Sequence, residues 1–215
     1  MLIPTAPPAA AQTAFAVGLP TFLSGPAGLG SPAFGGLAPT LPSLAEIGTG
    51  IIAALPVFVL RSTDAATATV SISPASEGWQ FFAGHNTGTN PQVISGTVVR
   101  LPPAHRWKMI NLYYGDIVLS ELGELQKLDE PSSFPQFAEQ NYEARLLWVP
   151  VANLKAYWLR AQKAGETDYY VPIPFGAEQP IVALSGTTPY ETSQFLAAIR
   201  PLAAGNLTIP PGFGA

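Results

Sequence analysis

Short stretches in which hydrophobic and polar residues alternate dominate the chain from residue 57 to residue 122, and this period of two predicts β-strands. Prolines and glycines separate the stretches and favour turns between them. The predicted strands are residues 57–61, 67–73, 79–82, 93–101, 107–114 and 116–122, the last two as a hairpin about Gly115. About six short strands in succession favour a β-sandwich or a barrel.

Helical spacing of apolar residues enters only in the second half of the chain. Residues 151–165 carry an apolar face and a basic face at helical spacing, and Gly165 follows where a C-terminal cap is expected. A second helix is predicted after Thr188, because Thr188 and Glu191 fit a capping box with a proline between them. Residues 167–175 and 180–186 are predicted strands, whereas residues 144–151 fit a helix or a strand equally.

The expected fold is therefore mainly β, of the α+β class. It consists of a single β-sandwich or barrel-like domain, residues 46–215, with two or three short helices in its C-terminal half. Residues 1–45 precede this domain and differ from it in composition.

Residues 1–45 contain no Asp, Glu, Lys, Arg or His, and proline and glycine recur throughout them. Such a composition interrupts helices and strands and predicts an extended arm. Its large apolar residues are spaced like anchors that would bury on the surface of another subunit. The predicted anchors are Leu2, Ile3, Phe15, Phe22, Leu29, Phe34, Leu37 and Leu41.

The whole chain is poor in charge. Charged residues make up 11% of its 215 residues and hydrophobic residues 47%, against about 25% charged residues in an average soluble protein. A surface of this kind is often covered by neighbouring subunits, although a monomer coated with Ser, Thr, Asn and Gln fits as well. The net charge of −4 argues against nucleic acid as a partner.

The absence of cysteine excludes disulfides, thiolate metal sites and a cysteine nucleophile. The N-terminus lacks the basic segment of a cleaved signal peptide, which argues against export by such a signal. The longest apolar run after residue 45, residues 47–60, is too short to cross a bilayer and contains Pro56. No membrane span is expected.

No catalytic, cofactor-binding or metal site is predicted. The two histidines, His85 and His105, have no partners at a meaningful spacing, and no nucleophile-elbow motif is present. Carboxylates between Asp116 and Glu130 could hold a glycosidase pair, but a solvated acidic face explains them more simply. Adjacent aromatic residues on the predicted strands could line a sugar groove, or they could fill the core on both faces.

Opposite charges occur in separate blocks. Residues 116–143 carry a net charge of −6 and residues 145–163 a net charge of +4. These blocks could pair within one fold or head to tail between copies.

In its general design the chain resembles virion building blocks, in which an arm rich in proline and glycine straps a β-rich body to its neighbours. The function expected first is a non-enzymatic structural protein of a virus-like particle: a bacteriophage capsid, cement or decoration, or tail component. Its partners would be copies of itself and other structural proteins of the same virion. The expected location is the virion, after synthesis in the host cytoplasm. A β-sandwich binding module, for instance for carbohydrate, is the alternative, and a hydrolase comes third.

Overall fold

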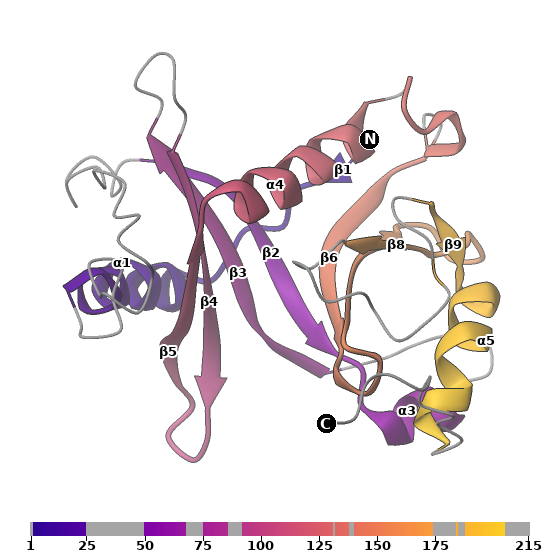
Figure 1. The fold of residues 1–215 in the computed structure, drawn as a ribbon, viewed down its shortest axis with the longest axis horizontal. Coiled ribbons are helices and arrows are strands. Elements are labelled where there is room, and N and C mark those ends of the chain that lie inside the picture. Colours follow the sequence, from indigo (N-terminus) through magenta and orange to yellow (C-terminus); the bar gives the residue numbers. More distant parts are fainter. Residues whose placement is uncertain are drawn as a thin grey trace, which may run out of the picture.

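A computed structural model of the chain describes residues 2–24, 50–67, 75–85, 92–130, 132–137, 140–173, 184 and 188–204. Figure 1 shows a β-rich fold with α-helices on both faces of its sheet. The strands are β1 (Leu2–Ile3), β2 (Ile51–Val59), β3 (Ala75–His85), β4 (Gln92–Leu101), β5 (Arg106–Tyr114), β6 (Tyr142–Val149), β7 (Leu154–Ala161), β8 (Tyr169–Ile173) and β9 (Tyr190–Glu191). The α-helices are α1 (Ala9–Ser24), α3 (Ser62–Thr67), α4 (Asp116–Asp129) and α5 (Thr192–Ala203), and the 3-10 helices are η2 (Pro135–Phe137) and η3 (Pro150–Ala152).

The described strands form one sheet in the order β5-β4-β3-β2-β6-β7-β8-β9, and β1 pairs with β6. Most neighbours are antiparallel, but β2 and β1 run parallel to β6, and Val57 of β2 lies opposite Leu146. The two ends of this order, β5 and β9, do not pair with each other. The α+β class with a dominant sheet is confirmed, whereas the predicted sandwich or barrel is not.

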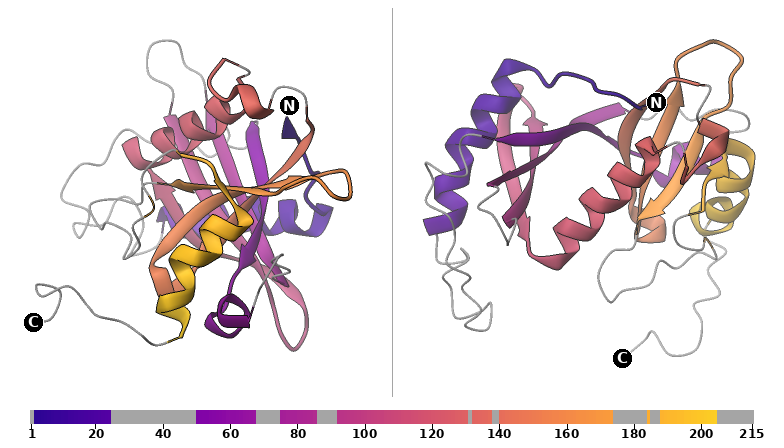
Figure 2. Two further views of the ribbon diagram at one scale, coloured as in Figure 1. Left: turned by 90° about the vertical axis from the view of Figure 1, so that its right-hand side faces the viewer. Right: turned by 90° about the horizontal axis from the view of Figure 1, so that it is seen from above.

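One face of the sheet, here called the inner face, packs against α4. The sheet bends between β2 and β6, so its two halves contribute to one core on this face (Figures 1 and 2). Gly115 has a φ of 79°, a conformation that favours glycine, and it turns the chain from β5 into α4. Four apolar residues then recur every three or four positions and face the sheet: Val118, Leu122, Leu125 and Leu128.

The opposite, outer face is covered in two places. Helix α1 packs on β3, β4 and β5, and helices α3 and α5 pack on β6, β7 and β8, as the two views of Figure 2 show. Phe15 of α1 stacks on Phe81 of β3, with 4.8 Å between the ring centroids. A Cβ atom on Gly96 would lie 2.8 Å from Phe15 Cε2 and 2.7 Å from Met109 Cε. Glycine at this position therefore permits the close approach of α1 to the sheet.

The prediction of an extended arm is wrong for residues 9–24, which form α1. Ala11, Phe15 and Leu19 recur every four residues within an alanine-rich stretch, and all three are buried on the outer face. Apolar burial on the sheet stabilises this helix, although Pro20 lies inside it. Residues 25–49 lie outside the described residues, so the predicted boundary at residue 45 is not tested.

Two predicted elements have the other type of secondary structure. Residues 116–122 were expected as a strand of a hairpin but begin α4, because the apolar stripe continues at helical spacing to Leu128. Residues 154–161 were expected within a helix but form β7, which is buried on both faces between β6 and β8. A strand buried on both faces loses the alternation that would identify it.

The other predictions are mostly confirmed. Strands occur within or across the predicted ranges 57–61, 79–82, 93–101, 107–114 and 167–175. Residues 144–151, which fitted a helix or a strand equally, are mainly strand β6. Helix α5 begins later than predicted, because Tyr190 and Glu191 pair with β8 and Glu191 becomes the N-cap in a capping box with Gln194. Pro201 lies inside its last turn. The predicted strands 67–73 and 180–186 lie almost wholly outside the described residues.

Replacing Phe15 with alanine should lower the free energy of unfolding of the isolated subunit by roughly 3–5 kcal/mol, the usual cost of removing a buried phenyl ring. The substitution V17A is the matched control on the same helix, because Val17 is 69% exposed and should change stability by less than about 0.5 kcal/mol. Urea unfolding of both variants measures the difference. Equal stability of F15A and the unsubstituted chain would contradict the packing of α1 on the sheet.

Candidate functional site

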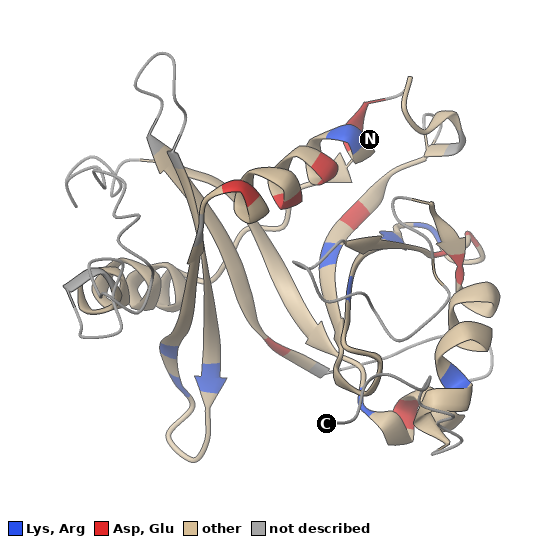
Figure 3. Cartoon of the chain, viewed as in Figure 1, with Lys and Arg blue, Asp and Glu red and all other residues tan. Residues whose placement is uncertain are grey.

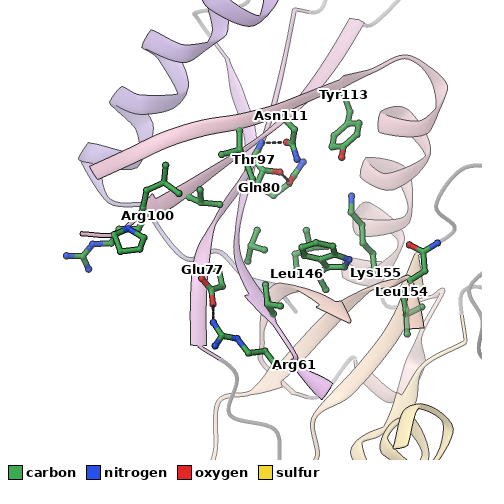
Figure 4. A pocket seen from close by; sticks show the side chains of 18 residues that line it. Arg61, Glu77, Gln80, Thr97, Arg100, Asn111, Tyr113, Leu146, Leu154 and Lys155 are labelled. Carbon is green, nitrogen blue, oxygen red and sulfur yellow. Dashed lines mark hydrogen bonds and ion pairs between the residues drawn. The ribbon is translucent and has the colours of Figure 1, made fainter. Parts of the chain in front are cut away.

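The inner face holds a cavity of about 470 Å³ beside α4, in the space between the two halves of the bent sheet (Figure 4). Strands β2 to β7 all contribute to its walls. Its apolar lining consists of Val57, Val59, Val99, Leu101, Pro102, Ile110, Leu146, Trp148 and Leu154. We call this space the inner cavity. Its size and largely apolar lining are typical of binding sites for small molecules.

A connected set of polar side chains lies on the β3–β5 wall of the inner cavity. Gln80 is only 1% exposed, and its side-chain amide donates to Ser95 Oγ while its carbonyl accepts from Thr97 Oγ1. The backbone N–H of Thr97 donates to Asn111 Oδ1 at 2.9 Å. Because the oxygen of the Asn111 amide accepts this bond, its Nδ2 group is the donor that remains toward the cavity (Figure 4).

Two ion pairs border the inner cavity at different places. Lys155 Nζ of β7 lies 3.0 Å from Glu121 Oε1 of α4 and 5.2 Å from the centroid of the Tyr113 ring. Arg61 Nη2 lies 3.0 Å from Glu77 Oε1 on the opposite side (Figure 4). Lys155 and Arg61 each have a carboxylate partner within the chain. Arg100 of β4 also lines the cavity, and this exposed residue adds a positive charge at its edge (Figure 4).

The tyrosines near α4 remain protonated at neutral pH. Burial, and secondarily the charge of Glu121, raises the pKa of Tyr113. Burial likewise raises the pKa of Tyr157 well above its ordinary value, and its hydroxyl donates to the main-chain oxygen of Glu121 at 2.6 Å. Both hydroxyl groups can therefore act as hydrogen-bond donors.

A second buried charge, Arg145, lies on the outer face and holds β6 against its neighbours. Its guanidinium carbon lies 4.7 Å from the ring centroids of both Phe58 and Trp158, and Nη2 lies 2.7 Å from Glu143 Oε2. Burial alone would raise the pKa of Glu143, but hydrogen bonds from Arg145 and Thr5 and the positive charge of Arg145 hold that pKa below its ordinary value. These contacts are internal and suit a structural role.

Three of the four acidic residues of α4 have partners within the chain. Glu121 pairs with Lys155, Glu124 Oε1 lies 2.7 Å from Lys127 Nζ, and Asp129 Oδ1 accepts from the backbone N–H of Leu2 at 2.7 Å. These separate pairings give no support to the conceivable glycosidase pair. They do show that part of the acidic block and the basic block pair within one subunit.

Neither histidine joins a site in the part of the chain that the structure describes. His105 is exposed in the turn between β4 and β5 with a φ of 51°. His85 ends β3, and its side chain is outside the described part. Among the described residues, no three His, Asp or Glu side chains converge as ligands for a metal ion.

The predicted anchors are only partly described. Phe15 is buried against its own sheet and Phe22 packs at the edge of the same cluster, so neither is free for a neighbouring subunit. Leu2 packs at the edge of the inner core, and Ile3 is partly exposed. The other four anchors, Leu29, Phe34, Leu37 and Leu41, lie outside the described residues.

The aromatic residues considered for a sugar groove mostly fill the core. Trp79, Phe81, Phe82 and Tyr170 are buried, whereas Trp148, which was not singled out, is 46% exposed in the wall of the inner cavity. The polar residues of the cavity were also missed. Their only signal is the recurrence of Ser95 and Thr97 at alternate positions between the apolar residues 93–94 and 98–99 of β4.

Comparisons with known proteins identify no relative. No protein family, no curated protein and no solved structure matches the chain. Within the described residues, no helix has both the length and the apolar character needed to cross a membrane. The site must therefore be interpreted from its own chemistry.

Replacing Glu121 with leucine should lower the free energy of unfolding by about 3 kcal/mol, because Lys155 would keep a largely buried charge without its carboxylate partner. The combined variant E121L/K155M should be less destabilised than the sum of the single variants. E77Q, which breaks the more exposed pair with Arg61, is the control and should cost less than about 1 kcal/mol. Additive effects in a urea-unfolding cycle would argue against the Glu121–Lys155 pair.

The free energy of unfolding should decrease in acid partly because of Glu143. A carboxyl group whose pKa is lower in the folded state stabilises that state above the unfolded pKa, and this contribution is lost as pH falls through the folded pKa. Urea unfolding at a series of pH values from neutral to below the ordinary pKa of 4.5 measures the loss. E143Q should weaken this pH dependence, and an unchanged pH profile would refute the assignment.

Proposed function

We propose that the chain is a non-enzymatic structural protein of a virus-like particle: a bacteriophage capsid, cement or decoration, or tail component. It is made in the host cytoplasm and becomes part of the virion by binding copies of itself and other structural proteins. The low content of charged residues supports this proposal, since charge-poor surfaces suit repeated contacts between subunits.

The observation that carries the proposal is the edge of the sheet formed by β5. This strand has nine residues, and among the described strands it pairs only with β4. A long edge strand offers unpaired backbone groups to another chain. The edge of β5 thus offers backbone hydrogen-bonding groups that a neighbouring subunit can cover.

The distribution of charge indicates which surface the edge would meet. Arg100, Arg106 and Lys108 lie together near the turn between β4 and β5, whereas acidic residues lie along α4 (Figure 3). Like charges on two β5 edges would repel each other if the same edges met. Contact between the basic hairpin of one copy and an acidic surface of the next gives complementary charges and a head-to-tail arrangement.

The part of the predicted arm that follows α1 would add further contacts between subunits. Helix α1 is held on its own subunit by Phe15 and Leu19. We assign contact with neighbouring subunits to the four anchors that follow α1 in the sequence: Leu29, Phe34, Leu37 and Leu41. Their apolar side chains would contribute affinity, while the charged hairpin would determine orientation.

Light scattering coupled to size-exclusion chromatography tests the proposal. The expected mass is a multiple of the 22.6 kDa subunit. The substitution K108E should weaken association at least about tenfold, through lost charge complementarity. K163E is the matched control, because it makes the same charge change in the exposed loop between β7 and β8. A monomer at every concentration, also when the other proteins of its particle are added, would refute an assembly role.

A binding module remains the second candidate function, and the inner cavity favours it. The carbohydrate variant of that function loses its main support, because the aromatic pairs proposed for a sugar groove lie mostly in the core. The cavity instead combines apolar walls with a few amide groups, which suits a different class of ligand.

A further inference from the structure

The inner cavity is open to a ligand that is mostly apolar. Its walls combine Ile110 of β5, Val57 of β2, and Leu146 and Trp148 of β6, and Ile110 and Trp148 are both nearly half exposed. A ligand in this space would remove these side chains from water, which is the main source of affinity in apolar sites. The walls therefore select for an aliphatic or aromatic body.

The polar wall adds a requirement for a hydrogen-bond acceptor. Asn111 Oδ1 already accepts from the backbone of Thr97, so its Nδ2 group has donors to offer. Gln80 is held in place by Thr97 and Ser95, and its Nε2 group has a second hydrogen in addition to the one given to Ser95. A carbonyl oxygen placed here would accept from fixed amide donors, and a purely apolar ligand would leave those donors without hydrogen bonds.

The charges around the cavity argue against an ionic ligand. Lys155 and Arg61 each have a carboxylate neighbour at 3.0 Å. An anionic ligand would have to compete with Glu121 or Glu77, and a cationic ligand would have to compete with Lys155 or Arg61. The third cation of the lining, Arg100, is exposed, and water and salt screen its attraction for an anion. A neutral ligand disturbs neither pair and loses less hydration on entering the cavity.

We propose that the inner cavity binds a neutral small molecule with an apolar body and one carbonyl group that accepts a hydrogen bond from Asn111 Nδ2. The carbonyl group belongs to an amide, ester or ketone. This binding site lies within one subunit and goes beyond the assembly function, so either can exist without the other.

Three probes of similar size test the chemistry with the full-length protein. N-phenylhexanamide has the apolar body and the carbonyl group, N-hexylaniline lacks the carbonyl group, and 6-phenylhexanoate carries a charge. Binding is measured by ligand-observed saturation-transfer NMR and by titration. We expect N-phenylhexanamide to bind with a Kd below about 1 mM. N-hexylaniline should bind about tenfold more weakly, the equivalent of one hydrogen bond. 6-Phenylhexanoate can accept the same hydrogen bond, but it should also bind about tenfold more weakly, because its charged carboxylate loses hydration on entering the cavity.

Substitutions in the cavity wall test whether the probes bind in the inner cavity. N111D keeps an oxygen that can accept from Thr97 N–H but removes the Nδ2 donor, so it should abolish the preference for N-phenylhexanamide over N-hexylaniline. W148A should weaken binding of both probes, because it removes an exposed part of the wall. V17A, on the outer face, should change neither affinity.

Two results would overturn the proposal. One is that N-phenylhexanamide does not bind at millimolar concentration, and the other is that N111D binds the amide and the aniline with the unchanged ratio. Light scattering on the same samples keeps this test separate from the assembly proposal. If K108E changes the mass of the oligomer in solution and N111D does not, the two surfaces act independently.

Discussion

Four apolar side chains of α4 fill the inner face of the sheet where its two halves meet, and Glu121 on the same helix pairs with Lys155 of β7. This contact joins strands from both halves of the sheet in one core. Without α4, a large apolar surface of the bent sheet would be exposed to water, at a substantial cost in free energy. The bend of the sheet and the position of the inner cavity both depend on this packing.

The outer face shows why one sheet can hold two further helical layers. Helix α1 covers one half of this face and helices α3 and α5 cover the other. Arg145 is accommodated in this layer because Phe58 and Trp158 flank its guanidinium group and Glu143 balances its charge.

The two surfaces proposed to bind partners lie where this covering is incomplete. The outer edge of β5 has no neighbouring strand among the described residues, and the inner face beyond α4 is hollow. The first surface offers backbone groups and charge, which suit another protein chain. The second offers apolar walls and amide donors, which suit a small neutral molecule. The two surfaces can be tested separately because they use different chemical groups.

The sequence by itself determined the β-rich character, most of the strand positions and the charge-poor composition. These features depend on local alternation and residue content, which can be read without knowing the neighbours. Only the tertiary structure decided the state of residues 154–161, because a strand buried on both faces has no alternation. The same holds for α1, whose helix is stabilised by Phe15 and Leu19 against the sheet rather than by its local sequence. The inner cavity could not be predicted either, since Gln80, Asn111 and Trp148 come together only when three separate strands are placed in the bent sheet.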